Sequence, residues 1–512
     1  MSRRGRTRDR LRSERSGVLA LLPWRNIRNP LAPIEVLSAD QVETIHLASL
    51  QVLSEIGMKV LGEQARAVYR RAGAQVDEGE ETVRFDPALV EELVAKAPRE
   101  FTIEARDQSR NIFLGANHIN FSCVGGPSFC SDLDKGRRAG TFREMGDFIR
   151  LVHMLDIVHC GSGSPFEPLD LPVPTRHLDK AYAGLTLSNK VISSSLLGGV
   201  RALDGLNMRA IAQGLDLEDI RGRPMIFGNI NTNSPRQLDA SMADGLMTLA
   251  HYGQPVVVTP FTLCGAMAPV TVVGALVQQN AEALAGMALA QAVNPGTPVV
   301  YGGFTSNVDM KTGAPAFGTP EYTKACQATG QMARRYGVPY RSSNTNASNT
   351  VDAQAAYESE MSIWGAVMGH ANFVFHGAGW LEGGLVASFE KLIVDAEMLQ
   401  MMACYLEPLR VDDETLALDA IREVQPGGHY FGAAHTLERY ETAFYTPLVS
   451  DWRNFETWEE AGALTATQRA NAIWKQMLKA YEKPPMDPAI DEALQAYVAK
   501  RKEEIERDPE SV

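Results

Sequence analysis

Short apolar runs recur along the middle of the chain at intervals of roughly 30 to 40 residues. Each run has the length of a strand and stops in a loop rich in Gly, Ser, Thr and Asn, after which apolar residues return at helical spacing. The runs begin near Ile119, Ile157, Val191, Met225, Val256, Pro298, Val338 and Asn372. The helical patterns cover 142–154, 177–187, 201–213, 236–251, 273–292, 320–336, 353–369 and 389–404.

Eight strand–helix units in succession predict an α/β fold, an eight-fold parallel β/α (TIM) barrel over residues 116–405. The alternative is an open, doubly wound sheet, in which one glycine-rich phosphate turn normally follows the first strand. Here polar, glycine-rich loops follow nearly every strand, and this favours the closed barrel. Two helices also carry local start signals, a capping box at Thr141 and Glu144, and Thr319 before Pro320.

The barrel is expected to carry an N-terminal α/β cap and a C-terminal helical extension. Residues 34–115 form the cap, in which Ser38 and Gln41 make a capping box. Its further helices are predicted at 63–72 and 87–97 and its strands at 82–86, 101–105 and 111–115. Residues 406–512 form the extension, with helices at 466–482 and 487–507. The basic segment 1–33 is predicted to be a disordered tail, or alternatively an arm that docks on an acidic partner or subunit.

Composition limits the partners of the protein. The chain of 512 residues has 45% hydrophobic and 22% charged residues, as ordinary globular proteins do, and a net charge of −13. That charge disfavours nucleic acid and anionic membranes and suits a neutral or cationic ligand. The six cysteines form no CxxC pair, and no apolar run reaches the ~20 residues that span a bilayer. We therefore expect reduced thiols, no membrane partner and a cytoplasmic location.

In a barrel of this kind the site lies where the strands end, and the residues there are aromatic or carry amides. Only His159 and His376 stand at strand ends as histidines, and no HxH, HExxH, GxSxG or GxGxxG motif occurs. This composition predicts no metal site, no catalytic triad and no bound nucleotide cofactor. Aromatic faces with neutral polar groups suit a quaternary ammonium, which cation–π contact would hold.

Each candidate also has a simpler interpretation. Trp380 binds the cation or only packs, and His376 belongs to the site or merely ends a strand. Glu382 is an electrostatic partner for the cation or a loop charge. Arg341 binds a substrate carboxylate or closes a salt bridge across the barrel mouth. The other predicted substrate-binding residues are aromatic and follow strand ends: Tyr301, Phe304 and Phe261.

Three motifs resemble the trimethylamine methyltransferase superfamily. They are YGGFTSNVDMKTGAPAFGTPE (301–321), DAQAAYES (352–359) and GWLEGGLVASFEKLIVDAEML (379–399). The resemblance implies an eight-fold barrel that transfers a methyl group from a methylated amine to the cobalt of a corrinoid. Archaeal members carry pyrrolysine a few residues before DAQ, at or beside Thr345 here. The ordinary residues in SSNTNASNT resemble the non-pyrrolysine branch, whose characterised members act on quaternary amines such as glycine betaine.

The resemblance also implies roles and partners. We expect catalytic roles for His376 and for the loop residues Asn344, Thr345 and Asn346. No cofactor is expected to be tightly bound, because the corrinoid (cobalamin) comes free or on a partner protein that docks at the barrel mouth. Apart from the resemblance, a homo-oligomer is expected, and the sequence makes His429 and His435 candidates to cover the mouth. The alternatives are another methylated donor (a tertiary amine or a sulfonium), a folate acceptor, or a betaine-binding barrel without turnover.

Overall fold

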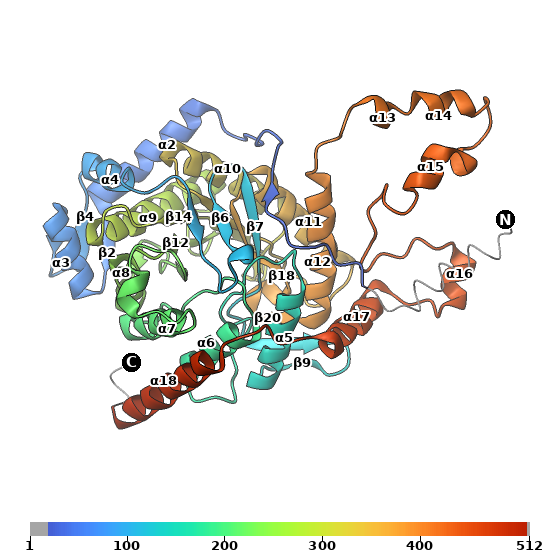
Figure 1. Ribbon diagram of the computed structural model, residues 1–512. Coiled ribbons are helices and arrows are strands. Elements are labelled where there is room, and N and C mark those ends of the chain that lie inside the picture. Colours follow the sequence, from blue (N-terminus) through green and yellow to red (C-terminus); the bar gives the residue numbers. More distant parts are fainter. Residues whose placement is uncertain (1–18, 509–512) are drawn as a thin grey trace.

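A sheet of parallel strands forms the centre of the molecule in the computed structural model, which describes residues 19–508 (Figure 1). Its strand order is β1-β7-β18-β17-β14-β12-β10, and every pair is parallel except β1 with β7. The parallel strands are β7 (His118–Cys123), β10 (Gly228–Ile230), β12 (Val256–Val258), β14 (Val299–Gly302), β17 (Tyr340–Ser343) and β18 (Phe373–Ala378).

Two of the eight predicted strands are reduced to isolated bridges. Parallel bridges join Ser122 to Cys160, Cys160 to Val191, and Ser193 to Phe227. The runs from 157 and from 191 pass quickly into Gly and Ser, which support no long ladder. All eight predicted helical segments contain a helix: α5 (Phe142–Met154), α6 (Arg176–Leu187), α7 (Gly199–Ile211), α8 (Ala240–His251), α9 (Val272–Val293), α10 (Pro320–Tyr336), α11 (Ala353–Met368) and α12 (Phe389–Tyr405). The α/β class is therefore confirmed.

Successive side chains of the strands belong to two different cores. Val257, Val300 and Phe373 lie in a cluster with residues of the hairpin β5 (Phe101–Ile103) and β6 (Ile112–Leu114). Their neighbours Val256, Val258 and Tyr301 lie in the larger cluster that includes the helices. This is the period of two that a strand imposes when both of its faces are buried. The face of the strand thus decides whether a side chain points toward the small inner cluster or toward the helices.

The N-terminal segment packs against the side of this body. Helices α2 (Ala39–Gln51), α3 (Glu63–Ala72) and α4 (Pro87–Val94) all contact α9, and the capping box predicted at Ser38 is confirmed. The π-helical turn η1 (Val52–Ile56) follows α2. A small sheet joins β11 (Gln237–Leu238), β2 (Met58–Val60), β4 (Thr82–Arg84) and β3 (Gln75–Asp77).

The structure differs from the predicted tail. Residues 1–18 lie outside the described residues, but 19–33 are packed against the body. Strand β1 (Ile27–Arg28) pairs with β7, and Ile27 is only 5% exposed. Trp24 meets His159 edge to face, with the ring centroids 5.0 Å apart. The prediction followed the many basic residues before this segment and did not take into account the apolar side chains of Trp24 and Ile27, which pack against the body.

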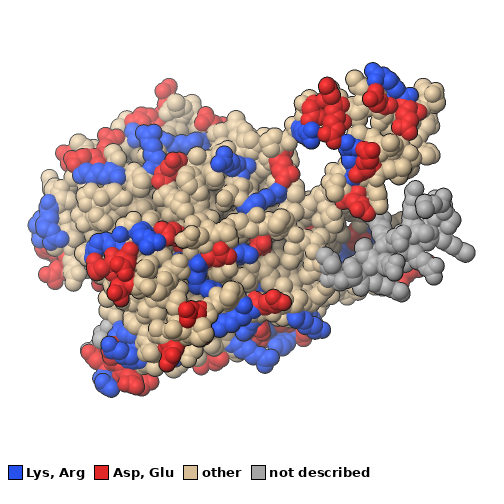
Figure 2. Space-filling model, viewed as in Figure 1, with Lys and Arg blue, Asp and Glu red and all other residues tan. Residues whose placement is uncertain are grey.

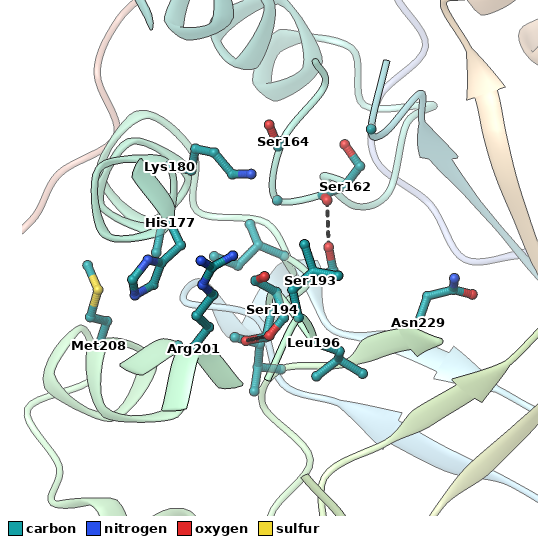
Figure 3. A pocket seen from close by; sticks show the side chains of 18 of the residues that line it. Ser162, Ser164, His177, Lys180, Ser193, Ser194, Leu196, Arg201, Met208 and Asn229 are labelled. Carbon is teal, nitrogen blue, oxygen red and sulfur yellow. Dashed lines mark hydrogen bonds between the residues drawn. The ribbon is translucent and has the colours of Figure 1, made fainter. Parts of the chain in front are cut away.

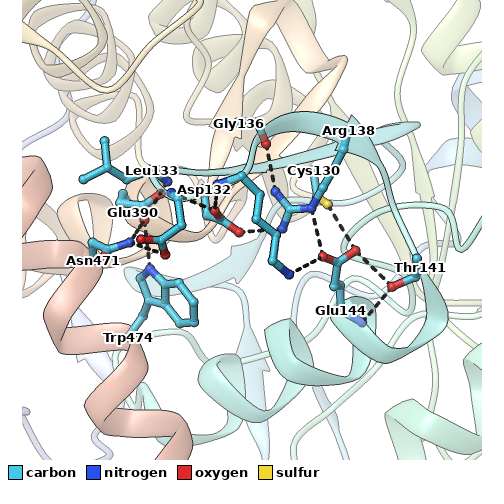
Figure 4. A network of polar contacts seen from close by, with 12 residues as sticks. Cys130, Asp132, Leu133, Gly136, Arg138, Thr141, Glu144, Glu390, Asn471 and Trp474 are labelled. Atoms are coloured by element: carbon cyan, nitrogen blue, oxygen red, sulfur yellow. Dashed lines mark hydrogen bonds and ion pairs between the residues drawn. The ribbon is translucent and has the colours of Figure 1, made fainter.

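The last two helices brace the body. Helix α17 (Ala466–Ala480) contacts α12 and α5, and α18 (Pro488–Arg507) contacts α6 and α7. The buried carboxylate of Glu390 on α12 accepts hydrogen bonds from Asn471 (2.8 Å) and Trp474 (2.9 Å) of α17 (Figure 4). In the same network, Arg138 of the hairpin β8 (Phe129–Asp132) and β9 (Gly136–Ala139) pairs with Asp132 and Glu144. No helix among the described residues is long and apolar enough to cross a membrane.

Between α12 and α17 the chain leaves the body as an arm (Figure 1), which we call the C-terminal arm and define as residues 407–447. It contains α13 (Asp413–Leu416), α14 (Leu418–Glu423), η5 (Tyr430–Gly432) and α15 (Ala434–Arg439), and α16 (Phe455–Glu460) follows it. Leu409 is 93% exposed and Phe444 84% exposed. His429 and His435 lie on this arm. Figure 2 shows the arm standing clear of the body.

Candidate active site

A cavity of about 390 Å³ lies at the carboxyl ends of the parallel strands. Its walls come from residues that end or follow β7, β10, β12, β14, β17 and β18, as expected for a sheet with parallel strands. Five of the predicted site residues line it: Phe261, Phe304, Arg341, His376 and Trp380. Its described lining includes no carboxylate.

Aromatic rings form one wall of the cavity. Phe261 and Phe304 are register partners in the parallel pair β13 (Phe261–Cys264) and β15 (Phe304–Val308), and their ring centroids are 5.0 Å apart. Trp380 begins β19 (Trp380–Leu381), which pairs with β20 (Val386–Ser388), and its ring lies 6.1 Å from that of Phe304. Three rings at these distances offer their faces and edges to one ligand, which is the arrangement that binds organic cations.

Arg341 supplies the only positive charge among the described lining residues of this cavity. Its side chain is buried, with the residue 2% exposed, and forms no ion pair with the described part of the chain; Nε has no hydrogen-bond partner there. The guanidinium lies 4.5 Å from the ring of Phe375 and 5.3 Å from that of Phe304. Burial lowers the pKa of Arg341 to about 10, so the group stays charged at neutral pH. A buried charge without a counter-charge is costly, and an anionic ligand would offset that cost.

His376 lies against Trp380, with the ring centroids 4.2 Å apart. Burial and then the charge of Arg341 hold the pKa of His376 well below its ordinary value, so its imidazole is neutral at physiological pH. Its Nδ1 has no hydrogen-bond partner among the described residues. The backbone of His376 has a φ of 53°, a conformation that residues other than glycine adopt rarely and often at functional sites. The cavity therefore holds a second polar group that is free to meet a ligand.

The loop after β17 lies behind this wall and does not line the cavity. Asn344 donates from Nδ2 to the carbonyl of Gly377 (3.0 Å). Asn346 donates to the carbonyl of Trp380 (3.0 Å), and the indole of Trp380 donates back to the carbonyl of Asn346 (3.2 Å). The carbonyl of Thr345 accepts from Ser362. These contacts hold Trp380 and the segment after His376 in place, while the side-chain oxygens of Asn344, Thr345 and Asn346 have no hydrogen-bond partner among the described residues.

A buried ion pair on α12 also helps to hold the segment that leads into Trp380. Lys391 and Asp395, both on α12, pair with each other, and Lys391 also donates to Ser359. Asp395 in turn accepts from the backbone N–H of Gly379 (2.8 Å), directly before Trp380. The structure thus fixes the aromatic wall by polar contacts from both α11 and α12.

Two predicted substrate-binding residues lie elsewhere. Tyr301 follows the inward Val300, so alternation turns it toward the helices, where its hydroxyl donates to Asn280 of α9 (2.9 Å). Glu382 turns away from the cavity and pairs with Arg137 (2.9 Å). The sequence placed both residues near strand ends and left open which way each side chain faces. Glu382 lies in the short 3-10 turn η4 (Glu382–Gly384), whereas Tyr301 lies in β14. In a strand the neighbouring residue faces the opposite side.

One lining residue, Phe375, escaped the sequence reasoning. Phe375 and His376 are adjacent in the chain and both line the cavity, which strict alternation forbids. The register between β18 and β7 shifts between Val374 and Ala378, and this irregularity lets both side chains reach the same space. No local signal in NFVFHGAG announces that shift. Asn229 and Asn231 also line the cavity, with the Asn229 amide donating to Asn231 (2.9 Å).

The fold and the cavity together define an α/β protein with a small-molecule site at the carboxyl edge of its parallel strands. The chain belongs to the trimethylamine methyltransferase family, whose model matches residues 2–506. The resemblance noted from the motifs is thereby confirmed. Within the part of the chain that the structure describes, no three His, Cys, Asp or Glu side chains gather as metal ligands would.

Relatives extend over nearly the whole chain. A glycine betaine methyltransferase of Desulfitobacterium hafniense (strain Y51) is 38% identical over 476 residues, covering 93% of this chain and 98% of the relative. The trimethylamine methyltransferase MttB of Desulfitobacterium hafniense (strain DSM 10664 / DCB-2) is 28% identical over 469 residues, covering 91% and 94%. A crystal structure of the hydroxylamine complex of MtmB aligns with a TM-score of 0.48 at 9% identity, covering 90% of this chain and 97% of that one.

Proposed function

We propose that the protein transfers a methyl group from a quaternary amine that carries a carboxylate, of which glycine betaine is the simplest, to a reduced corrinoid. The observation that carries this proposal is Arg341, a buried guanidinium without a counter-charge beside the aromatic wall of Phe261, Phe304 and Trp380. The similarity to a glycine betaine methyltransferase supports the same substrate class.

The charge of Arg341 favours a zwitterion over a bare cation. The described lining holds no carboxylate, so a simple ammonium ion would meet the aromatic wall but also the repulsion of the guanidinium. In a betaine the carboxylate pairs with Arg341 while the trimethylammonium group rests on the rings. The neutral His376 adds a polar contact without a second positive charge. Protonated tertiary amines without an acid group are therefore disfavoured as donors.

The main contribution of the protein residues to this reaction is to position the substrate. When a methyl group leaves a quaternary ammonium, the N–C bond breaks with its electron pair on nitrogen, and the product is a neutral tertiary amine. The reduced corrinoid supplies the nucleophile. No general acid is needed, and the site residues contribute orientation and exclusion of water, which can account for a large part of a rate enhancement. We place the corrinoid, free or on a partner protein, at the mouth of the cavity.

We also propose that the parallel strands close into an eight-fold β/α barrel spanning residues 116–405. The bridges through Cys160, Val191, Ser193 and Phe227 support closure, because they lead from β7 to β10 across the two reduced strands. The separate inner cluster of Val257, Val300 and Phe373 is what a filled barrel interior would contain. In this view residues 34–115 are the cap and residues 406–512 the extension.

The C-terminal arm supports a homo-oligomer. Its apolar residues, such as Leu409 and Phe444, are almost fully exposed, and a second copy of the chain would cover them. The outer faces of α11 and α12 expose Trp364 and Tyr405, which offer a matching surface on the partner. Deleting residues 408–446 should lower the mass measured by light scattering to that of a single chain.

A spectroscopic assay tests the proposed function. Purified protein is mixed with photochemically reduced cob(I)alamin and, separately, with glycine betaine, a sulfonium carboxylate, trimethylamine and tetramethylammonium. Formation of methylcobalamin is followed by absorbance. We expect turnover with the zwitterions and little with the two amines that lack a carboxylate. If no quaternary amine methylates the corrinoid, the proposal fails, and calorimetric binding of betaine without turnover would instead indicate a binding barrel.

A further inference from the structure

A second cavity, of about 200 Å³, adjoins the first one between α6 and α7 (Figure 3). The two cavities share residues of the loop after β7, of strand β10 and of the segments that follow residues 160 and 191: Gly126, Ser162, Ser193, Ser194 and Asn229. The half-exposed Leu197 belongs to its lining, so the second cavity opens to solvent. The methyl transfer proposed above makes no use of it.

Positive charge dominates this second cavity. Lys180 of α6 and Arg201 of α7 converge on its space in Figure 3. Glu167 is the one carboxylate among the described lining residues, and Lys180 (2.7 Å) and Arg176 (3.5 Å) already engage it. Arg201 forms no ion pair with the described residues, and its Nε is buried without a hydrogen-bond partner. The pKa of Arg201 is lowered by burial and by the charge of Arg176, and the charge of Glu167 opposes this shift. Arg201 therefore shares the single lining carboxylate with Lys180 and Arg176, and the positive charge is in excess.

A buried histidine lines the same space. His177 is 7% exposed, and its Nε2 lies 2.9 Å from Asp204. Its Nδ1 has no partner among the described residues. On the opposite wall, Ser193 donates to the carbonyl of Ser162 and stands beside Ser194. The N-terminus of α7, whose N-cap Gly198 provides no side-chain bond, adds a positive helix dipole close to Arg201.

We propose that this second cavity binds a small oxyanion, a phosphate or a carboxylate, with the guanidinium of Arg201 as its principal partner and Lys180 beside it. A guanidinium with free donors matches an oxyanion in geometry as well as in charge. The chain as a whole has a net charge of −13 and does not attract anions non-specifically. An anion would therefore bind because of the positive charge gathered locally in this cavity. Two sources share this chemistry: a separate inorganic anion, and the distal carboxylate of a betaine longer than glycine betaine. The second source rests on the proposed function, and the first does not.

Calorimetry with inorganic phosphate tests the site directly. Phosphate is titrated into the full chain alone and again in the presence of saturating glycine betaine, which would occupy Arg341. We expect wild type to bind phosphate and Arg201→Gln to bind at least about tenfold more weakly, the loss expected for a charged hydrogen bond. Arg201 makes no bond that the fold needs, so the variant should keep its melting temperature. Arg221→Gln, which removes an exposed arginine paired with Glu218, is the matched control and should bind as wild type does.

A second series identifies the source of the anion. Glycine betaine and 4-trimethylammoniobutanoate are compared as ligands of wild type and of Arg201→Gln. A loss of at least about tenfold for the longer betaine alone assigns the site to the carboxylate of the methyl donor. A response to phosphate alone assigns it to a separate anion. If Arg201→Gln binds both phosphate and the longer betaine as wild type does, the inference is wrong. Binding is measured without a methyl acceptor, so the test of the anion site gives a result even if the protein does not transfer methyl groups.

Discussion

Replacing Arg341 by methionine should separate stability from function. Burial lowers the pKa of this guanidinium to about 10, well below its ordinary value. At about 1.4 kcal/mol per pKa unit, this lowering corresponds to an upper cost of about 3 kcal/mol for holding the charge in the ligand-free protein. Methionine has a similar length and no charge. We therefore expect the free energy of unfolding of the ligand-free protein to rise by about 1–3 kcal/mol in Arg341→Met.

The same substitution should remove the preference for zwitterions. Losing the partner of a desolvated carboxylate costs about 2–5 kcal/mol, which is a factor of at least about 30 in affinity. Glycine betaine should bind that much more weakly to Arg341→Met, whereas tetramethylammonium should bind more tightly than to wild type because the repelling charge is gone. Urea denaturation and calorimetry measure the two effects on the same samples.

A surface arginine provides the control for this experiment. Arg335 pairs with Glu43 outside the cavity. Arg335→Met should therefore leave the affinities for glycine betaine and for tetramethylammonium unchanged. The reasoning is refuted if Arg341→Met binds glycine betaine as wild type does, or if it is less stable than wild type without ligand. The first result would show that the substrate carboxylate does not bind Arg341. The second would show that the charge of Arg341 has a stabilising partner in the ligand-free protein.

Three further predictions concern the neighbourhood of the site. His376→Ala should lower turnover at least about tenfold while leaving the fold intact, as circular dichroism would show, and near-normal kinetics would remove His376 from the site. Gly384→Ala should reduce glycine betaine affinity, because a Cβ there would meet the indole of Trp380 at 2.6 Å and the φ of +98° disfavours any side chain; unchanged affinity would contradict a role for the indole face. Burial lowers the pKa of His159 to about 4. The unfolded chain, with an ordinary histidine pKa near 6.5, therefore takes up a proton first as pH falls, and about 2 kcal/mol of stability should be lost between pH 7 and 5. In His159→Gln that part of the pH dependence should vanish from urea denaturation curves.

The sequence determined the α/β class and the positions of the helices. Helical periodicity and caps are local, so α3 and α10 appear within the residues predicted for them. The motifs also identified the family. Polar loops at strand ends pointed to Phe261, Phe304, Arg341 and Trp380, because parallel strands bring their carboxyl ends together.

Only the tertiary structure decided which side chains face the ligand. A shift of one residue along a strand reverses its facing, so Tyr301 turned toward α9 and Arg341 toward the cavity. The register shift in β18 placed both Phe375 and His376 in the cavity, which alternation in the sequence does not foresee. The absence of a counter-charge beside Arg341 in the described chain depends on distances between segments far apart in sequence. Local pattern fixes where a strand ends, whereas facing and charge pairing are set by the neighbours that packing brings to it.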